Sequence, residues 1–74
     1  MTDEKIRDYL HRQPFQPFDI RVSDGRCYTV DHPDFLMRSR GGRLVYLVTE
    51  DDREIVLDVE HIVSMEVANR PKVA

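Results

Sequence analysis

The segment from Pro14 to Arg26 constrains the fold of this chain more than any other stretch. Its first part, Pro-Phe-Gln-Pro-Phe, contains two prolines that fix φ and disfavour helical geometry at the residues before them. Its second part alternates apolar Phe18, Ile20 and Val22 with polar residues, a period-2 pattern typical of a half-buried strand. The segment therefore predicts that a helix ends before Pro14 and that a sheet begins at Phe18.

The Asp-Gly pair that follows this strand indicates a hairpin turn. A two-residue loop would turn Tyr28 and Val30 to the polar face of the sheet. A three-residue loop, with Gly25 in the left-handed region as a bulge, instead sets Ile20 against Tyr28 and Phe18 against Val30. We predict the second register because it keeps the apolar side chains on one face.

The whole chain predicts a mainly β fold with an N-terminal helix, in a single domain over residues 1–68. Ile6, Tyr9 and Leu10 form one apolar stripe on the helix, and the stripe must pack on the sheet because so short a helix is unstable alone. Phe15 and Phe18 are expected in the core beside it. The expected elements are a helix at about 3–12, strands at about 18–23, 26–30, 35–38, 43–49, 54–59 and 62–67, and a frayed tail at 69–74.

The sequence after residue 34 predicts the burial of the later strands and the overall architecture. The run from Leu44 to Thr49 is apolar at both parities, which favours a central strand buried on both sides. By parity we also expect the rings of Phe35 and Tyr46 to be buried, and we place His61 in a tight bend before the last strand. Short strands with tight turns favour a small, partly open antiparallel barrel of SH3-like or Sm-like type with five or six strands, because closure removes sheet edges.

Composition and charge exclude several classes of protein. Hydrophobic residues make up 41% of the 74 residues and charged residues 34%, with the signs interspersed, so we expect one globular module. The run Leu44 to Val48 is far shorter than the ~20 residues of a membrane helix, so no membrane association is expected. A net charge of -3 gives no global attraction to nucleic acid. Cys27 is the single cysteine, which excludes an intramolecular disulfide and suits a cytoplasmic location.

The sequence resembles two groups of proteins. The stretches Pro14 to Arg26, Val30 to Leu36 and His61 to Val63 look like a family of short, uncharacterised bacterial proteins with Pro-Phe-x-Pro-Phe, Asp-Gly-Arg and His-Pro-Glu-Phe motifs. That resemblance implies no known activity. More weakly, the Asp-Gly turn and the segment Glu60 to Ser64 are similar to the first hairpin and the histidine-containing bend of Sm-like barrels of the Hfq type. Because Glu60 replaces a basic residue there, this second resemblance implies a fold and no binding residues.

The strongest candidate for a binding site is the turn 38–43, in which three arginines flank Gly41-Gly42. Arg38, Arg40 and Arg43 could gather their guanidinium groups beside backbone N–H groups, an arrangement that binds phosphate or an acidic partner. Nucleic acid is an alternative ligand with weak support, because few aromatic stacking platforms lie nearby in the sequence. The alternative to a binding site is a solvated turn in which the arginines only maintain solubility. The acidic residues that could complement it in a homo-oligomer are Glu50, Asp51, Asp52 and Glu54.

No catalytic or metal-binding constellation stands out. The Asp-His-Pro-Asp cluster at 31–34 has only His61 and His11 as distant companions, which gives no convergent ligand set. We expect a corner in which one of its aspartates bonds nearby backbone. Cys27 and His32 match a nucleophile and a base in residue type, but no orienting group accompanies them. We therefore expect no enzymatic activity, no cofactor and no metal.

These observations predict a function class and leave the ligand unknown. Short strands with potential open edges, together with a core of marginal size, favour a non-catalytic protein-interaction or self-assembly module. Its expected partner is another protein or a second copy of the chain, in the bacterial cytoplasm. Binding of nucleic acid or phosphate through Arg38, Arg40 and Arg43 is the alternative.

Overall fold

The computed structural model describes residues 2–67 and shows a mainly β fold with one short N-terminal helix. The strands form two antiparallel sheets, sheet A in the order β2-β1-β6 and sheet B in the order β3-β4-β5. The predicted tail at 69–74 lies outside the described residues. The elements are α1 (Asp3–Leu10), β1 (Phe18–Val22), β2 (Cys27–Val30), β3 (Leu36–Arg38), β4 (Leu44–Val48), β5 (Glu54–Asp58) and β6 (Ile62–Val67), with 3-10 turns η1 (Pro33–Phe35) and η2 (Val59–His61).

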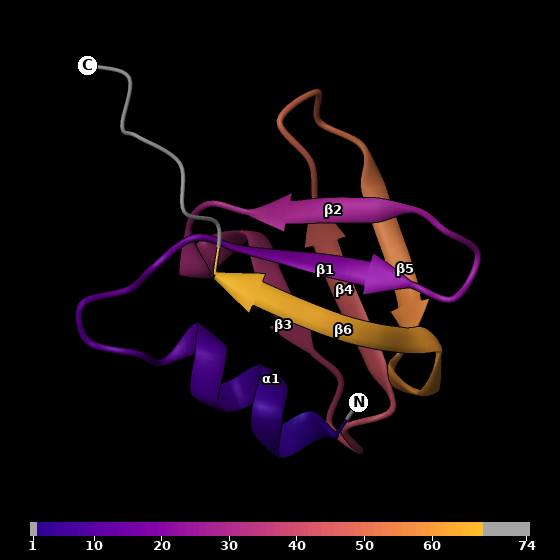
Figure 1. Cartoon of the computed structure of the whole chain (residues 1–74), viewed down its shortest axis with the longest axis horizontal. Helices are drawn as coiled ribbons and strands as arrows, with labels where there is room; N and C mark the ends of the chain where they lie inside the picture. Colours follow the sequence, from indigo (N-terminus) through magenta and orange to yellow (C-terminus); the bar gives the residue numbers. More distant parts are fainter. Residues whose placement is uncertain (1, 68–74) are drawn as a thin grey trace.

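The two sheets enclose one core. In Figure 1, sheet A lies in front of sheet B, their strands cross steeply, and α1 runs along the lower side of the pair. Within residues 2–67 no ladder joins the two sheets, so they do not form a closed barrel. Both sheets and the helix contribute the fully buried side chains, which are Ile6, Phe18, Ile20, Val30, Val45, Leu47 and Ile62.

Helix α1 packs on this core through the predicted stripe. Ile6 and Leu10 are buried, and the Tyr9 ring meets the Phe18 ring edge-on at 5.3 Å. The helix ends at Leu10, earlier than the predicted end at 12, because His11 leaves helical geometry and closes the last turn with its N–H on the Arg7 carbonyl at 2.9 Å.

The predicted register of the first hairpin is confirmed. Phe18 lies opposite Val30, and Ile20 lies opposite Tyr28. The Val22 N–H donates to the Arg26 carbonyl at 2.9 Å and closes a three-residue loop, in which Gly25 has φ +91°. The bulged turn therefore keeps the apolar residues of β1 and β2 on the core side of sheet A.

The expected burial of β4 on both sides is wrong. Val45 and Leu47 are buried, whereas Val48 on the opposite face is 42% exposed and Tyr46 is only half-buried. Phe35, also expected inside, is 46% exposed. The reason is that sheet A and α1 cover only the inner face of sheet B, and no element of residues 2–67 covers its outer face.

The corner and the bend expected from sequence are both 3-10 turns. The Asp-His-Pro-Asp cluster leads into η1, and His61 ends η2 directly before β6. In the corner, however, the capping side chain is not an aspartate: the Nδ1 atom of His32 accepts the backbone N–H of Asp34 at 3.1 Å. Histidine can take this role because its unprotonated ring nitrogen is an acceptor.

Candidate functional site

The three arginines singled out by the sequence do not converge on one point. Arg38 ends β3, and its Nη1 donates to both carboxylate oxygens of Asp3 at 2.7 Å. The Arg38 side chain is 25% exposed and that of Asp3 36%. Arg40 and Arg43 are exposed in the turn that follows. Arg38 therefore binds the start of α1, and two of the three arginines are left on the surface of the turn.

The backbone of the arginine turn is engaged as well. The N–H groups of Ser39 and Gly42 donate to the carbonyls of Leu44 and Ser39, at 2.8 and 3.0 Å respectively. Those of Arg43 and Leu44 both donate to the Ser39 hydroxyl oxygen, at 3.2 and 3.0 Å. These donors are thus used inside the turn. Anion binding by Arg38, Arg40 and Arg43 stays a prediction, and the exposed side chains of Arg40 and Arg43 would have to carry it.

Asp3 and Gly42 complete a contact between helix and turn. Gly42 has φ +73°, and a Cβ placed there would lie 3.0 Å from the Cγ atom of Asp3. Glycine suits both conditions, because it adopts positive φ without strain and adds no side chain. Asp3 also lies in the first turn of α1, where the helix dipole favours a carboxylate. The contact of Asp3 with Arg38 and Gly42 therefore fixes α1 against sheet B.

The histidines and the cysteine occupy separate places. His11 caps the end of α1, and the Nδ1 atom of His61 lies 3.2 Å from the Ser23 hydroxyl. Cys27 is exposed on β2, and no hydrogen bond joins it to His32 within residues 2–67. In the same part of the chain, no three His, Cys, Asp or Glu side chains are grouped so that they could hold a metal ion.

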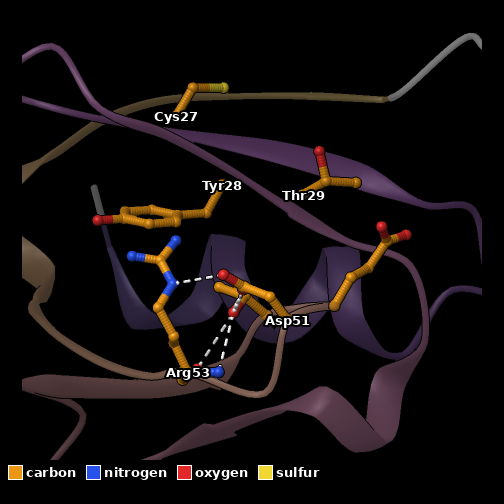
Figure 2. Close-up of a pocket in the computed structure, with 7 residues that line it drawn as sticks. Cys27, Tyr28, Thr29, Asp51 and Arg53 are labelled. Atoms are coloured by element: carbon orange, nitrogen blue, oxygen red, sulfur yellow. Dashed lines mark hydrogen bonds and ion pairs between the residues drawn. The ribbon is translucent and has the colours of Figure 1, made fainter.

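A pocket of about 340 Å³ opens between β2 and the turn from β4 to β5 (Figure 2). Within it, the Arg53 Nε atom donates to the Asp51 carboxylate at 2.9 Å. These two charged groups neutralise each other, and the exposed carboxylate of Glu50 is the unpaired charge of the lining within residues 2–67. The lining residues are Cys27, Tyr28 and Thr29 from β2, and Thr49, Glu50, Asp51 and Arg53 from the turn.

Two side chains near this pocket have shifted pKa values. The Thr49 hydroxyl donates to Asp51 and lowers the pKa of that carboxyl below its ordinary 3.8, and the charge of Arg53 adds to the effect. A hydrogen bond with Tyr28 raises the pKa of the Arg26 guanidinium, which is charged in any case. Both shifts stabilise charged forms at the surface and prepare no group for proton transfer.

The outer face of sheet B carries apolar side chains that the sequence analysis did not assign to a site. They alternate along the strands with the buried residues Leu36, Val45 and Leu47. Met37 lies opposite Tyr46 and Tyr46 opposite Val56, so these three form a row across the sheet. We call the whole set the apolar face; it consists of Met37, Leu44, Tyr46, Val48 and Val56.

Two sequence signals mark the apolar face. One is the apolar character of 44–48 at both parities, which we interpreted as burial on both sides. The other is Val56, the single apolar residue on the otherwise polar side of its strand. Neither signal distinguishes a face covered by the chain's own fold from a face left open. Only the arrangement of the layers makes that distinction.

Opposite charges lie at the two ends of the apolar face. β4 begins after the turn that contains Arg40 and Arg43, and it ends before the turn 49–53. The second turn is acidic through 50–52, and Glu54 next to it lies opposite Val48 on the outer side of sheet B. The turns at the two ends of β4 are therefore opposite in charge, whereas on the outer side of sheet B itself Asp58 lies opposite Leu44 and Glu54 opposite Val48, one carboxylate at each end.

Comparison of the chain with family models, curated proteins and solved structures finds no match. The resemblances to short bacterial proteins and to Sm-like barrels accordingly stay predictions. No helix within residues 2–67 is both long and apolar enough to cross a lipid bilayer.

Proposed function

We propose that this protein is a non-catalytic protein-interaction module that self-associates through the apolar face. One observation carries the proposal, the row of Met37, Tyr46 and Val56 across sheet B. Met37 is 62% exposed and Val56 49%. An antiparallel sheet with one face in water normally carries polar side chains on that face. A connected apolar surface is typical of a site that a protein partner covers.

The proposed partner is a second copy of the chain. The apolar face has a basic turn at one end and an acidic turn at the other, so a copy of the same surface complements it in charge. Two such faces would pack as stacked sheets about 10 Å apart, with their side chains interdigitated. Self-association would also add apolar burial to a chain whose own core is small.

We propose further that the fold is an open form of an SH3-like or Sm-like barrel. Its support is that β6 pairs with β1, that β2 leads through η1 into β3, and that the 3-10 turn η2 precedes the last strand. A cytoplasmic location belongs to the same proposal, since a reducing compartment suits the exposed thiol of Cys27.

The substitution Val56→Lys tests the proposed interface. Sedimentation velocity over a range of concentrations should show a reversible dimer for the wild-type chain. In the variant we expect self-association to weaken about tenfold or more, because an ammonium group would be buried without a partner. Val63→Lys is the matched control: Val63 is 55% exposed but lies on β6, outside sheet B, so this variant should associate like the wild type.

Circular dichroism of both variants checks that the fold is retained. A wild-type chain that stays monomeric at its highest soluble concentration contradicts the proposal. Equal loss of association in the two lysine variants contradicts it as well, because the effect would then not depend on the apolar face.

A further inference from the structure

The open edge of sheet B at β5 is a surface separate from the apolar face. We infer that this edge binds an extended segment of another protein, in which basic side chains flank an apolar one on the outer side. The segment pairs with β5 as an antiparallel fourth strand of sheet B. Binding of this kind uses the backbone of β5 and does not require self-association.

The backbone of β5 is paired on one side only. Its neighbour is β4, and within residues 2–67 no strand pairs with its other side (Figure 1). The Thr49 N–H donates to the Arg53 carbonyl at 3.0 Å just before the strand. The Val59 N–H donates to the Arg43 carbonyl at 2.8 Å just after it. Because bonded and non-bonded residues alternate along an antiparallel ladder, these two bonds fix which residues of β5 point away from β4. They are Glu54, Val56 and Asp58.

These residues form an open edge. Their N–H groups, and the carbonyls of Glu54 and Val56, have no partner within residues 2–67. The edge is five residues long and contains no proline. By contrast, β3 has only three residues, and on β6 the Tyr9 hydroxyl donates to the Met65 carbonyl at 3.5 Å. A free edge of this length is a template for an added strand.

The inner side chains of β5 are incompletely covered. Val45 and Leu47 of β4 are buried, whereas their cross-strand partners Leu57 and Ile55 are only half-buried. The two partners lie on the edge strand, where no further strand of residues 2–67 shields them. An added strand with apolar side chains on its inner side would cover them and extend the core. The bound segment should therefore be apolar at the two positions that face inward.

The outer side of β5 selects the charge of the segment. Val56 lies between Glu54 and Asp58, and neither carboxylate takes part in an ion pair within residues 2–67. The stretch 50–60 has six carboxylates and a single arginine, Arg53, which pairs with Asp51 at 2.9 Å. Basic side chains opposite the two free carboxylates would form cross-strand pairs of opposite charge, with an apolar side chain between them opposite Val56.

A second copy of β5 does not fit this edge. Two β5 strands paired antiparallel about Val56 would set Glu54 of each copy against Asp58 of the other. A shift by two residues would set Asp58 against Asp52 in one direction, and Glu54 against Glu60 in the other. Like charges directly opposite one another destabilise a ladder. The carboxylates therefore oppose pairing between copies and favour a basic strand.

Synthetic peptides test the site by fluorescence anisotropy. The probe has the core Lys-Val-Val-Val-Lys, and a control with the core Glu-Val-Val-Val-Glu should bind at least about tenfold more weakly. N-methylation of the middle valine removes the N–H that faces β5 in the antiparallel pairing, so binding should weaken about tenfold or more. N-methylation of the following valine is the matched control, because its N–H points away from β5, and this peptide should bind like the probe.

Variants of the protein test the charges. Glu54→Gln together with Asp58→Asn should weaken binding about three- to tenfold, and asparagine can keep the cap that Asp58 gives to the Glu60 N–H. Glu50→Gln together with Asp52→Asn removes two charges outside β5 and should leave binding unchanged. Met37→Lys, which should prevent the proposed self-association, should also bind the probe like the wild type, so the two proposals fail separately.

Amide hydrogen exchange, measured by NMR, locates the bound peptide. The N–H groups of Glu54, Val56 and Asp58 should become protected when the probe binds, whereas those of Ile55 and Leu57 are bonded to β4 in the free protein. Binding without this protection, or equal weakening by the two N-methylated peptides, contradicts strand pairing. Equal weakening by the two double variants contradicts the assigned charge contacts. No binding of the probe at millimolar concentration refutes the site.

Discussion

At the residue scale, Gly42 has two constraints at once, its positive φ of +73° and its contact with Asp3. We expect Gly42→Ala to lower the free energy of unfolding by about 1–2 kcal/mol, because alanine in the left-handed region is strained and its Cβ would displace the Asp3 carboxylate. Urea denaturation measures the change. Gly41→Ala is the control: Gly41 has no atom within 4 Å of the added Cβ, and its φ is not positive, so the effect should stay within about 0.5 kcal/mol. Equal losses would contradict this account.

Asp51 has a lowered pKa because the Thr49 hydroxyl donates to its carboxylate. This hydrogen bond favours the charged form, so it stabilises the turn above the ordinary pKa of 3.8 and is lost as the pH falls through the lower folded-state value. We expect carboxyl NMR titration to place the Asp51 midpoint below 3.8, and Thr49→Val to move that midpoint upward. Thr29→Val should leave it unchanged, because the Thr29 hydroxyl donates to Asp19. No upward movement in Thr49→Val would refute the assigned cause.

At the scale of elements, the turns of the three hairpins between β1 and β5 have one hydrogen bond in common, although the loop 40–43 is one residue longer than the other two. In each, a residue with positive φ donates its N–H to the carbonyl three residues earlier; these residues are Gly25, Gly42 and Asp52. The first hairpin could be predicted in register, because only a bulged turn puts the apolar residues of both its strands on one face. Asp52 gives no such signal, since aspartate occurs both in ordinary turns and in the left-handed region.

The contact between α1 and sheet B could not be predicted, because Asp3 and Arg38 are 35 positions apart and arginines in a Gly-Gly turn are typical of a solvated loop. We expect Arg38→Gln to lower the free energy of unfolding by about 0.5–1 kcal/mol, a modest loss because the pair is partly exposed. Arg40→Gln should leave stability unchanged within about 0.5 kcal/mol, since Arg40 is exposed and makes no ion pair within residues 2–67. Chemical denaturation that gives equal losses for the two variants would refute the structural role of Arg38.

At the scale of the whole molecule, the number of layers decides which apolar residues are buried. The apolar residues at both parities of β4 predict burial on both sides, and the structure buries only one of these sides, through Val45 and Leu47. Burial of Tyr46 was expected because an apolar residue in a central strand is usually covered on both sides. Sheet B has only sheet A and α1 as neighbours within the described chain, so its second face is open. Sequence periodicity indicates which residues form the apolar face, but it does not indicate whether another element covers that face.

An open apolar face that binds a second copy makes stability depend on concentration. Only folded chains associate, so association stabilises the folded state more at higher concentration. The apparent Tm of the wild-type protein should therefore rise with protein concentration. Met37→Lys should abolish this rise, and its Tm at the lowest concentration should match that of the wild type because Met37 is 62% exposed in the monomer. Val63→Lys, on β6, should keep the rise. Differential scanning calorimetry over a hundredfold range of concentration measures all three slopes. A flat wild-type slope would mean that no dimer forms, and a rise that persists in Met37→Lys would place the interface elsewhere on the molecule.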